Sequence, residues 1–313
     1  MQGLELARAF FEDYGKPMLV SQFPELLPKL AAGLFGSGSE CFGYDDEVSR
    51  DHDFEPGFCI FLPDESAVDR RSAFLLERAY AKLPKEYEGF RRQTLLPVGG
   101  ARHGVLRIGE FFRAMVGSPD GTLTTAQWLS IPEEALAEAV NGELYFDNLG
   151  EVTSIRASLS AFPEDVRLKR LAGQLLLMGQ AGQYNYDRCL RHGETAAAQL
   201  AACEFAKSAI SAAFLLNRRY QPYYKWSFRA LRALPKLCGL ASPLETLVST
   251  PNGAEDIPVK KRIIEEAAAA VAAMLAEEGL SAAPGSELEA HAYAVNDRIR
   301  DGELRNMHIL AGV

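Results

Sequence analysis

The amino-acid sequence predicts two domains: an α+β domain, a small mixed sheet with helices, over residues 1–160, and an all-α helical bundle over residues 161–313. Three observations predict this arrangement. Short apolar runs of strand length occur only before residue 150, where they alternate with helical periodicity. Long Ala- and Leu-rich segments with apolar residues at helical spacing fill the second half. A length of 313 residues is itself typical of about two domains.

The first half of the chain alternates helix and strand signals. Apolar residues at helical spacing predict helices over residues 4–14, 23–34 and 66–83. Short apolar runs, each next to Pro, Gly or another turn residue, predict strands over residues 58–62, 105–108 and 143–146. This alternation favours a sheet with helices packed on it.

The second half carries helix signals almost alone. Four long segments have helical periodicity and are bounded by Pro or Gly: residues 163–180, 187–220, 223–240 and 259–278. Helices of this length joined by short connections pack as an antiparallel bundle.

Composition excludes several classes of protein. A formal net charge of -9 argues against binding nucleic acid over a broad surface, which needs a basic face. We find no run of about 18 apolar residues and no signal-peptide pattern, so we expect a cytoplasmic protein with no membrane partner. The five cysteines are scattered and odd in number, which predicts reduced thiols.

The residues that indicate chemistry lie between residues 36 and 53. Gly36-Ser37-Gly38-Ser39 is followed by Asp51-His52-Asp53. Aspartates at i and i+2 on an extended chain point to the same side, so both carboxylates can bind one hard cation. Mg²⁺ prefers such oxygen ligands together with substrate phosphates, and Mn²⁺ accepts them too. The glycines let backbone N–H groups approach a polyphosphate, to which the Ser37 or Ser39 hydroxyl can donate a hydrogen bond.

This pattern resembles the nucleotidyltransferase superfamily that includes DNA polymerase beta and kanamycin nucleotidyltransferase. The superfamily signature is Gly-Ser, a gap of about ten residues and Asp-x-Asp on a strand, and here eleven residues separate Ser39 from Asp51. The whole block over residues 36–54 is similar to an uncharacterised bacterial branch of that superfamily. Residues 216–226 resemble the helical domain of the same branch, so the resemblance covers most of the chain.

The resemblance implies a role for each residue of this pattern. Gly38 and Ser39 would contact the triphosphate of a nucleoside triphosphate, with ATP as the expected nucleotide. Asp51 and Asp53 would hold Mg²⁺, and members of the superfamily use a third carboxylate on a neighbouring strand. The predicted strand over residues 105–108 carries no acid, and Glu110 follows one turn later, so we take Glu110 as the candidate third acid.

Two basic residues are further candidates for contacts with the nucleotide. Arg50 could contact a phosphate or form an ion pair with the nearby acids. Lys225 lies among aromatic residues, in Pro222-Tyr223-Tyr224-Lys225-Trp226, whose rings could stack on a base or a sugar. Alternatively, this segment is a packing corner with the lysine head in water.

The predicted function is Mg²⁺-dependent transfer of a nucleoside monophosphate from a nucleoside triphosphate to a hydroxyl of an unknown acceptor, with release of pyrophosphate. By fold analogy, the acceptor is expected to be a small polyhydroxylated molecule. The alternative is a nucleotide-binding sensor or regulatory protein that has lost turnover, as the missing strand carboxylate suggests. The sequence is compatible with a homo-oligomer and does not determine the oligomeric state.

Overall fold

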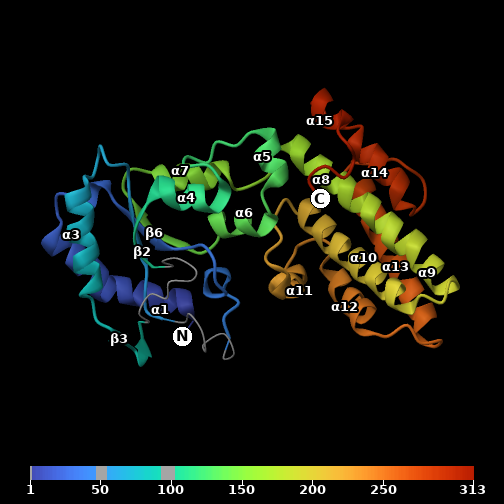
Figure 1. Ribbon diagram of the computed structural model, residues 1–313, viewed down its shortest axis with the longest axis horizontal. Helices are drawn as coiled ribbons and strands as arrows, with labels where there is room; N and C mark the ends of the chain where they lie inside the picture. Colours follow the sequence, from blue (N-terminus) through green and yellow to red (C-terminus); the bar gives the residue numbers. More distant parts are fainter. Residues whose placement is uncertain (1, 47–54, 93–102) are drawn as a thin grey trace. The chain divides into compact units, whose positions relative to one another are not determined.

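The computed structural model describes residues 2–46, 55–92 and 103–313. Its contacts divide the chain into two compact units (Figure 1). Unit 1 contains Met1–Leu123 and Ala135–Ser160, and unit 2 contains Thr124–Glu134 and Ala161–Val313. Unit 2 therefore includes residues 124–134, which the sequence analysis places in the first predicted domain. The mixed α/β character predicted from the sequence is confirmed, with a small sheet and many helices.

A four-stranded sheet in the order β5-β2-β1-β6 forms the centre of unit 1. Its strands are β1 (Ala31–Leu34), β2 (Cys59–Leu62), β5 (Gly104–Arg107) and β6 (Glu143–Asp147). β1 pairs antiparallel with both β2 and β6, and β2 pairs parallel with β5. Strands β2, β5 and β6 cover the three strands that the sequence predicts, each to within one or two residues.

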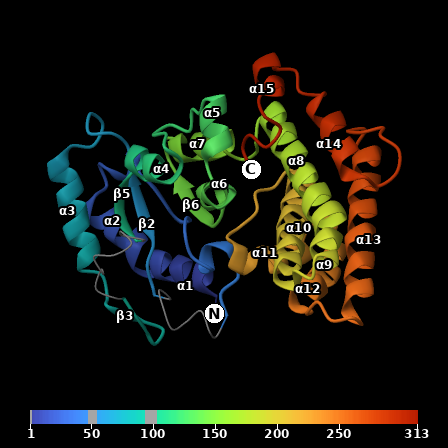
Figure 2. The same cartoon turned by 45° about the vertical axis from the view of Figure 1, so that its right-hand side comes forward.

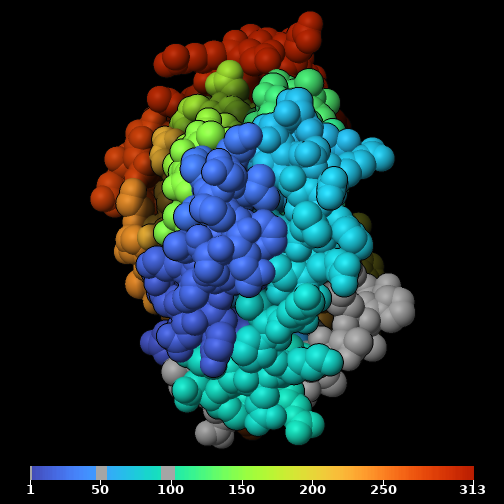
Figure 3. All heavy atoms as spheres, turned by 90° about the vertical axis from the view of Figure 1, so that its left-hand side faces the viewer, coloured from blue at the N-terminus to red at the C-terminus, as the bar shows by residue number. Residues whose placement is uncertain are grey.

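One face of the sheet packs on the N-terminal helices and on α3 (Arg70–Ala81). The N-terminal helices are α1 (Gly3–Phe10), a π-helical turn η1 (Phe11–Gly15) and α2 (Lys16–Gln22). Phe10 and Leu19 from these helices share a buried cluster with Ile60 of β2 and Leu76 of α3. Figure 3 shows this side of unit 1, with the N-terminal helices in blue beside α3 in cyan.

Aromatic side chains cover the opposite face. Phe35 stacks on Phe61 with ring centroids 4.7 Å apart, and Phe111 meets Phe35 edge-on at 5.2 Å. Phe111 belongs to α4 (Ile108–Val116), the helix that directly follows β5. The later helices of unit 1 are α6 (Glu133–Val140), whose first two residues belong to unit 2, and α7 (Glu151–Ser158). A separate two-stranded ribbon joins β3 (Glu86–Tyr87) to β4 (Phe90–Arg91).

The predicted helix over residues 23–34 is wrong. That segment contains a short 3-10 turn, η2 (Leu27–Lys29), followed by the central strand β1. Ala31-Ala32-Gly33-Leu34 has the composition of a helix, but the strand is buried on both faces and needs small residues there. A Cβ on Gly33 would lie 2.4 Å from the Glu143 carbonyl oxygen of β6, so only glycine fits at this position.

The regular secondary structure of unit 2 consists of helices joined by loops (Figure 2). Its helices are α5 (Thr125–Ser130), α8 (Glu164–Met178), the π-helical η5 (Gly179–Tyr186), α9 (Asp187–Arg191), α10 (Thr195–Leu216), α11 (Tyr224–Arg232), η6 (Cys238–Leu240), α12 (Ala241–Ser249), α13 (Asp256–Glu277), α14 (Leu288–Asn296) and α15 (Gly302–Asn306). Helix α8 packs on both α10 and α14. The predicted segment 187–220 is interrupted at Gly193, whose φ of +75° ends α9 and separates it from α10.

Helix α10 lies at the centre of unit 2. Of the described helices, it is the one long and apolar enough to cross a membrane by length and composition alone, although Gln199, Glu204 and Lys207 interrupt its apolar sequence. However, 67% of its apolar window is buried within the protein, because the helix packs against α8, η5 and α12. Its apolar character is thus that of a core helix.

Candidate functional site

The Gly-Ser segment forms a tight loop at the C-terminal end of β1. Gly36 and Gly38 have φ angles of +121° and +122°, which side chains with a Cβ rarely adopt. Ser39 then opens a 3-10 turn, η3 (Glu40–Phe42), and its carbonyl oxygen accepts hydrogen bonds from Phe42 and Tyr44 N–H. The two glycines therefore allow a backbone path that brings Ser37 and Ser39 into one short turn.

A side-chain amide from the segment before β6 holds this loop. Gly36 N–H donates to Asn141 Oδ1 at 2.9 Å, and Asn141 Nδ2 donates to the Gly36 carbonyl oxygen at 2.8 Å. The next residue, Gly142, donates its N–H to the Cys41 carbonyl oxygen at 2.9 Å. The sequence analysis missed Asn141. Its signal was the Asn-Gly dipeptide directly before the predicted strand, which is typical of a turn.

The strand register brings the Gly36–Ser39 loop to the start of β2. Gly33 pairs with Cys59 in the antiparallel β1–β2 ladder, so the end of β1 and the start of β2 share one edge of the sheet. Cys59 also pairs with Gly104, which puts the start of β5 at the same edge. The predicted metal ligands Asp51 and Asp53, and the predicted phosphate contact Arg50, lie outside the described residues.

A carboxylate and an imidazole meet at this edge. His103 Nδ1 and Glu55 Oε1 are 3.0 Å apart, and both side chains are largely buried. Glu55 precedes β2, and His103 directly precedes β5. Sequence reasoning did not find this pair, because the two residues are 48 positions apart and no local pattern connects them.

Glu110 lies in the first turn of α4, beyond the C-terminal end of β5. The Gly36–Ser39 loop is at the sheet edge where β5 begins, so Glu110 comes after the opposite end of this strand. However, α4 runs back toward the loop, where Gly36 approaches Phe111 and Met115. As a result, Glu110 and Ser37 line the same cavity of about 670 Å³, together with Arg107.

The described residues do not form a metal site by themselves. Among residues 2–46, 55–92 and 103–313, no group of three or more His, Cys, Asp or Glu side chains is arranged to hold a metal ion. The expected Mg²⁺ ligands Asp51 and Asp53 lie outside the residues to which this statement applies. Their carboxylates are hard oxygen donors, which suit Mg²⁺ by their chemistry.

Lys225 lies in unit 2, in the first turn of α11. Its Nζ is 5.0 Å from the centroid of the Trp226 ring, and the Arg229 guanidinium carbon is 5.8 Å from the same centroid. The preceding rings of Tyr223 and Tyr224 are in contact, with centroids 4.4 Å apart, and 48% and 74% of these residues' surfaces are exposed. The aromatic and basic residues thus form one exposed cluster.

A buried polar cluster lies next to these tyrosines in unit 2. Glu133 accepts hydrogen bonds from Ser211 Oγ at 3.2 Å and from the backbone N–H of Gln221 at 3.1 Å. Burial raises the pKa of its carboxyl group, although the Arg170 guanidinium 4.0 Å away counteracts this shift. These residues and Tyr223 line a cavity of about 330 Å³.

Comparison with known proteins gives one match. A family model described as a domain of unknown function (DUF4037) matches residues 128–227. The match covers about a third of the chain and includes the buried Glu133–Arg170 cluster and the segment from Tyr223 to Trp226. No curated protein and no solved structure matches the chain.

Proposed function

We propose that the protein is a cytoplasmic Mg²⁺-dependent nucleotidyltransferase, with a nucleotidyltransferase-like unit 1 and a helical-bundle domain in unit 2. The observation that carries this proposal is the β1–β2 register. It brings the glycine-rich loop to the same sheet edge as the start of β2, and β2 begins six residues after Asp53 in the chain. A phosphate-binding loop and a metal-binding Asp-x-Asp segment need this proximity, because the aspartates would hold a cation whose charge offsets that of the phosphates.

The residues of the loop have roles that follow from their chemistry. Backbone N–H groups around Gly38 and the hydroxyls of Ser37 and Ser39 would donate hydrogen bonds to phosphate oxygens. Asp51 and Asp53 would hold Mg²⁺ or Mn²⁺, and Arg50 would contact the triphosphate. When bound, the metal ion supplies charge stabilisation to the entering and leaving oxygens.

The proposed reaction balances as a single in-line substitution. A hydroxyl oxygen of the acceptor forms a bond to the α-phosphorus of the nucleotide, and the bond from that phosphorus to the bridging oxygen of the β-phosphate breaks. Pyrophosphate leaves, and a general base takes the hydroxyl proton. The acceptor is a hydroxyl compound, with a small polyhydroxylated molecule as the first class to test.

Two groups are candidates for that base. Glu110 shares a cavity with Ser37, but it follows the end of β5 away from the loop. The Glu55–His103 pair precedes β2 and β5 at the sheet edge where the loop begins, which makes it the second candidate. Glu55 would orient the imidazole through Nδ1, as carboxylates orient histidines in other general-base pairs.

A second function is a nucleotide-binding sensor without turnover. It is favoured by β5, whose four residues carry no carboxylate where the superfamily pattern has one. The two functions differ in one observable, because both require Mg²⁺-dependent nucleotide binding and only the enzyme releases pyrophosphate.

Thermal unfolding with each of the four ribonucleoside triphosphates, with and without Mg²⁺, tests the proposal. Binding at a hundredfold excess over the dissociation constant stabilises the folded state by about 2.7 kcal/mol. We expect a Mg²⁺-dependent rise in the unfolding temperature with ATP, and its loss in Asp51→Ala/Asp53→Ala. The charge-matched control Glu25→Ala/Glu277→Ala removes two exposed carboxylates elsewhere and should keep the full rise.

Each outcome decides between the functions. A rise that survives in Asp51→Ala/Asp53→Ala, or no rise with any nucleotide, contradicts the proposed site. If the rise depends on both aspartates, pyrophosphate release is then measured with a panel of polyhydroxylated acceptors. Release that is lost in His103→Asn, with nucleotide binding retained, supports the Glu55–His103 base, whereas loss in Glu110→Gln alone supports Glu110.

A further inference from the structure

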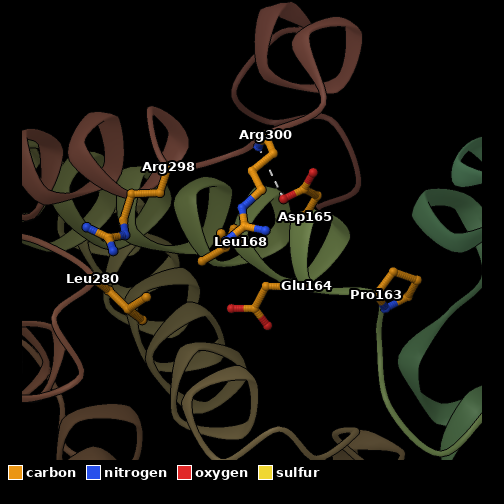
Figure 4. A pocket seen from close by; sticks show the side chains of 7 residues that line it. All are labelled: Pro163, Glu164, Asp165, Leu168, Leu280, Arg298 and Arg300. Carbon is orange, nitrogen blue, oxygen red and sulfur yellow. Dashed lines mark hydrogen bonds between the residues drawn. The ribbon is translucent and has the colours of Figure 1, made fainter.

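Unit 2 contains a cavity of about 480 Å³ at the start of α8 (Figure 4). Glu164, Asp165 and Leu168 of α8 form one wall. The cavity is also lined by Leu280, from the turn after α13, and by two arginines. These are Arg298 and Arg300, from the segment that joins α14 to α15.

The two carboxylates of this cavity already have partners. Glu164 accepts hydrogen bonds from Arg167 at 2.7 Å and from Arg218 at 2.5 Å, so both its oxygens face guanidinium groups. Asp165 accepts the backbone N–H groups of Arg300 and Asp301 at 3.2 and 2.9 Å. The charge of Glu164 is therefore balanced by guanidinium groups, whereas Asp165 is held by neutral backbone donors.

Arg298 and Arg300 are exposed, and their guanidinium groups have no such partner. Within the described ranges, no ion pair or hydrogen bond joins either group to another side chain. The lining contains these two guanidinium groups and two carboxylates, and Arg167 and Arg218, which are outside the lining, pair with one of the carboxylates, Glu164. Arg298 and Arg300 are thus the lining cations that have no ion-pair partner among the described residues, in a chain whose net charge is -9.

We infer that this cavity binds a phosphate monoester of a small organic molecule. The guanidinium groups of Arg298 and Arg300 present planar pairs of donors that match a phosphate group, and a dianion balances their two charges. Leu168 and Leu280 are buried apolar side chains that would cover the organic part of the ester.

This inference goes beyond the proposed function and does not depend on it. It assigns a ligand to unit 2 alone, whereas the proposed nucleotide site uses residues of unit 1. It also needs no metal ion. The two can therefore fail separately in experiments on the full-length chain.

Isothermal titration calorimetry of the full chain with inorganic phosphate and with phenyl phosphate, in metal-free buffer, tests the inference. Phenyl phosphate should bind, and it should bind more tightly than inorganic phosphate because its ring reaches the leucines. Arg298→Gln/Arg300→Gln should weaken binding about a hundredfold, since each lost charge-assisted hydrogen bond costs about tenfold. Arg298→Lys/Arg300→Lys keeps the charge without the planar donors and should lose less.

The matched control is Arg191→Gln/Arg262→Gln, which removes two exposed arginines of α9 and α13 and changes the net charge equally. It should bind phenyl phosphate as the native protein does, and so should Asp51→Ala/Asp53→Ala. If a double variant is unfolded by circular dichroism, the single variants Arg298→Gln and Arg300→Gln replace it, each with about a tenfold loss expected.

Four results would overturn the inference. The first is no binding of either phosphate probe by the native protein. The second is an equal loss in the matched control, which would indicate diffuse charge attraction. The third is equal affinity for both probes, which would identify free phosphate as the ligand. The fourth is displacement of phenyl phosphate by a single-stranded oligonucleotide that binds more tightly, which would identify a nucleic-acid site.

Discussion

Single residues decide the conformation of the glycine-rich loop. Gly36 and Gly38 take φ angles near +120°, and Asn141 holds Gly36 through both its backbone N–H and its carbonyl group. The conformation of the loop therefore depends on two glycines and on the side-chain amide of Asn141, and we expect single substitutions at these positions to destabilise the folded state.

We predict that Gly36→Ala destabilises the protein by about 1–3 kcal/mol, the usual cost of forcing a residue with a Cβ into this region. Space is not the cause, since the nearest atoms to the new Cβ would be 3.6 Å away or more. Urea denaturation measures the effect. Gly239→Ala is the control, because no atom lies within 4 Å there and its φ is not positive, so its stability should change little. An unchanged stability in Gly36→Ala would contradict the described loop conformation.

Glu164 predicts a dependence of stability on pH. Hydrogen bonds from Arg167 and Arg218 lower the pKa of this carboxyl from 4.5 to about 2. The ionised form therefore stabilises the folded state above pH 4.5, and this contribution falls as the pH drops toward 2. Because Glu164 is about half exposed, we expect Glu164→Gln to lose at most about 1 kcal/mol at neutral pH.

Urea denaturation of the native protein and of Glu164→Gln between neutral pH and the acid transition measures this effect. The difference in unfolding free energy between the two proteins should shrink as the pH falls. The control is Asp297→Asn, which removes an exposed carboxylate other than Glu164. Its difference in unfolding free energy from the native protein should not shrink comparably as the pH falls. A difference that is constant with pH would mean that the arginine pairs do not hold Glu164 in its ionised form.

Among the helices of unit 2, polar side chains join segments that are far apart in the sequence. Lys169 of α8 is fully buried, and its ammonium group donates to Asn296 Oδ1 at 3.0 Å and to the Met307 carbonyl oxygen at 2.7 Å. It thus ties the ends of α14 and α15 to α8. Burial lowers the pKa of Lys169, and neutral oxygens rather than a carboxylate surround it.

We expect Lys169→Met to destabilise the protein by about 2 kcal/mol or more, because buried carbonyl and amide oxygens lose their donor. Thermal and urea unfolding provide the measurement. Lys207→Met removes a lysine whose side chain is 73% exposed and pairs with Glu204, so it should change stability by less than about 0.5 kcal/mol. Equal effects in the two variants would argue against the Lys169 contacts.

At the scale of the whole molecule, the two units have separate candidate ligands. The nucleotide proposal rests on the sheet edge of unit 1, and the phosphate-ester inference rests on helices of unit 2. Ligand binding slows hydrogen exchange at the amides of the segment that the ligand orders. Because the two candidate sites use different segments, each ligand should slow exchange in a different part of the chain.

We predict that ATP with Mg²⁺ slows amide exchange in β1, the residue 36–44 segment and β2, whereas phenyl phosphate slows exchange at the start of α8 and between α14 and α15. Hydrogen-exchange mass spectrometry of the full chain measures both patterns. Asp51→Ala/Asp53→Ala should remove the first pattern and keep the second. If both ligands protected the same peptides, the assignment of separate sites would be wrong.

The sequence by itself determined the features that depend on neighbouring residues. Periodic apolar positions predicted the long helices of unit 2, and the bounded run over residues 58–62 predicted β2. The Gly-Ser loop and the Asp-x-Asp segment were found as motifs, although Asp51 and Asp53 lie outside the described residues. The wrong helix over residues 23–34 shows the limit, because Ala31 to Leu34 form a strand through pairing with β2 and β6.

Only the tertiary structure decided which distant residues meet. Asn141 holds Gly36 across 105 positions, and His103 meets Glu55 across 48. Arg298 and Arg300 share a cavity with Glu164, which lies more than a hundred positions earlier. Local patterns record spacing along a helix or a strand, whereas these contacts depend on strand register and helix packing. Those are determined by the burial of the whole core and leave no signal in any short segment.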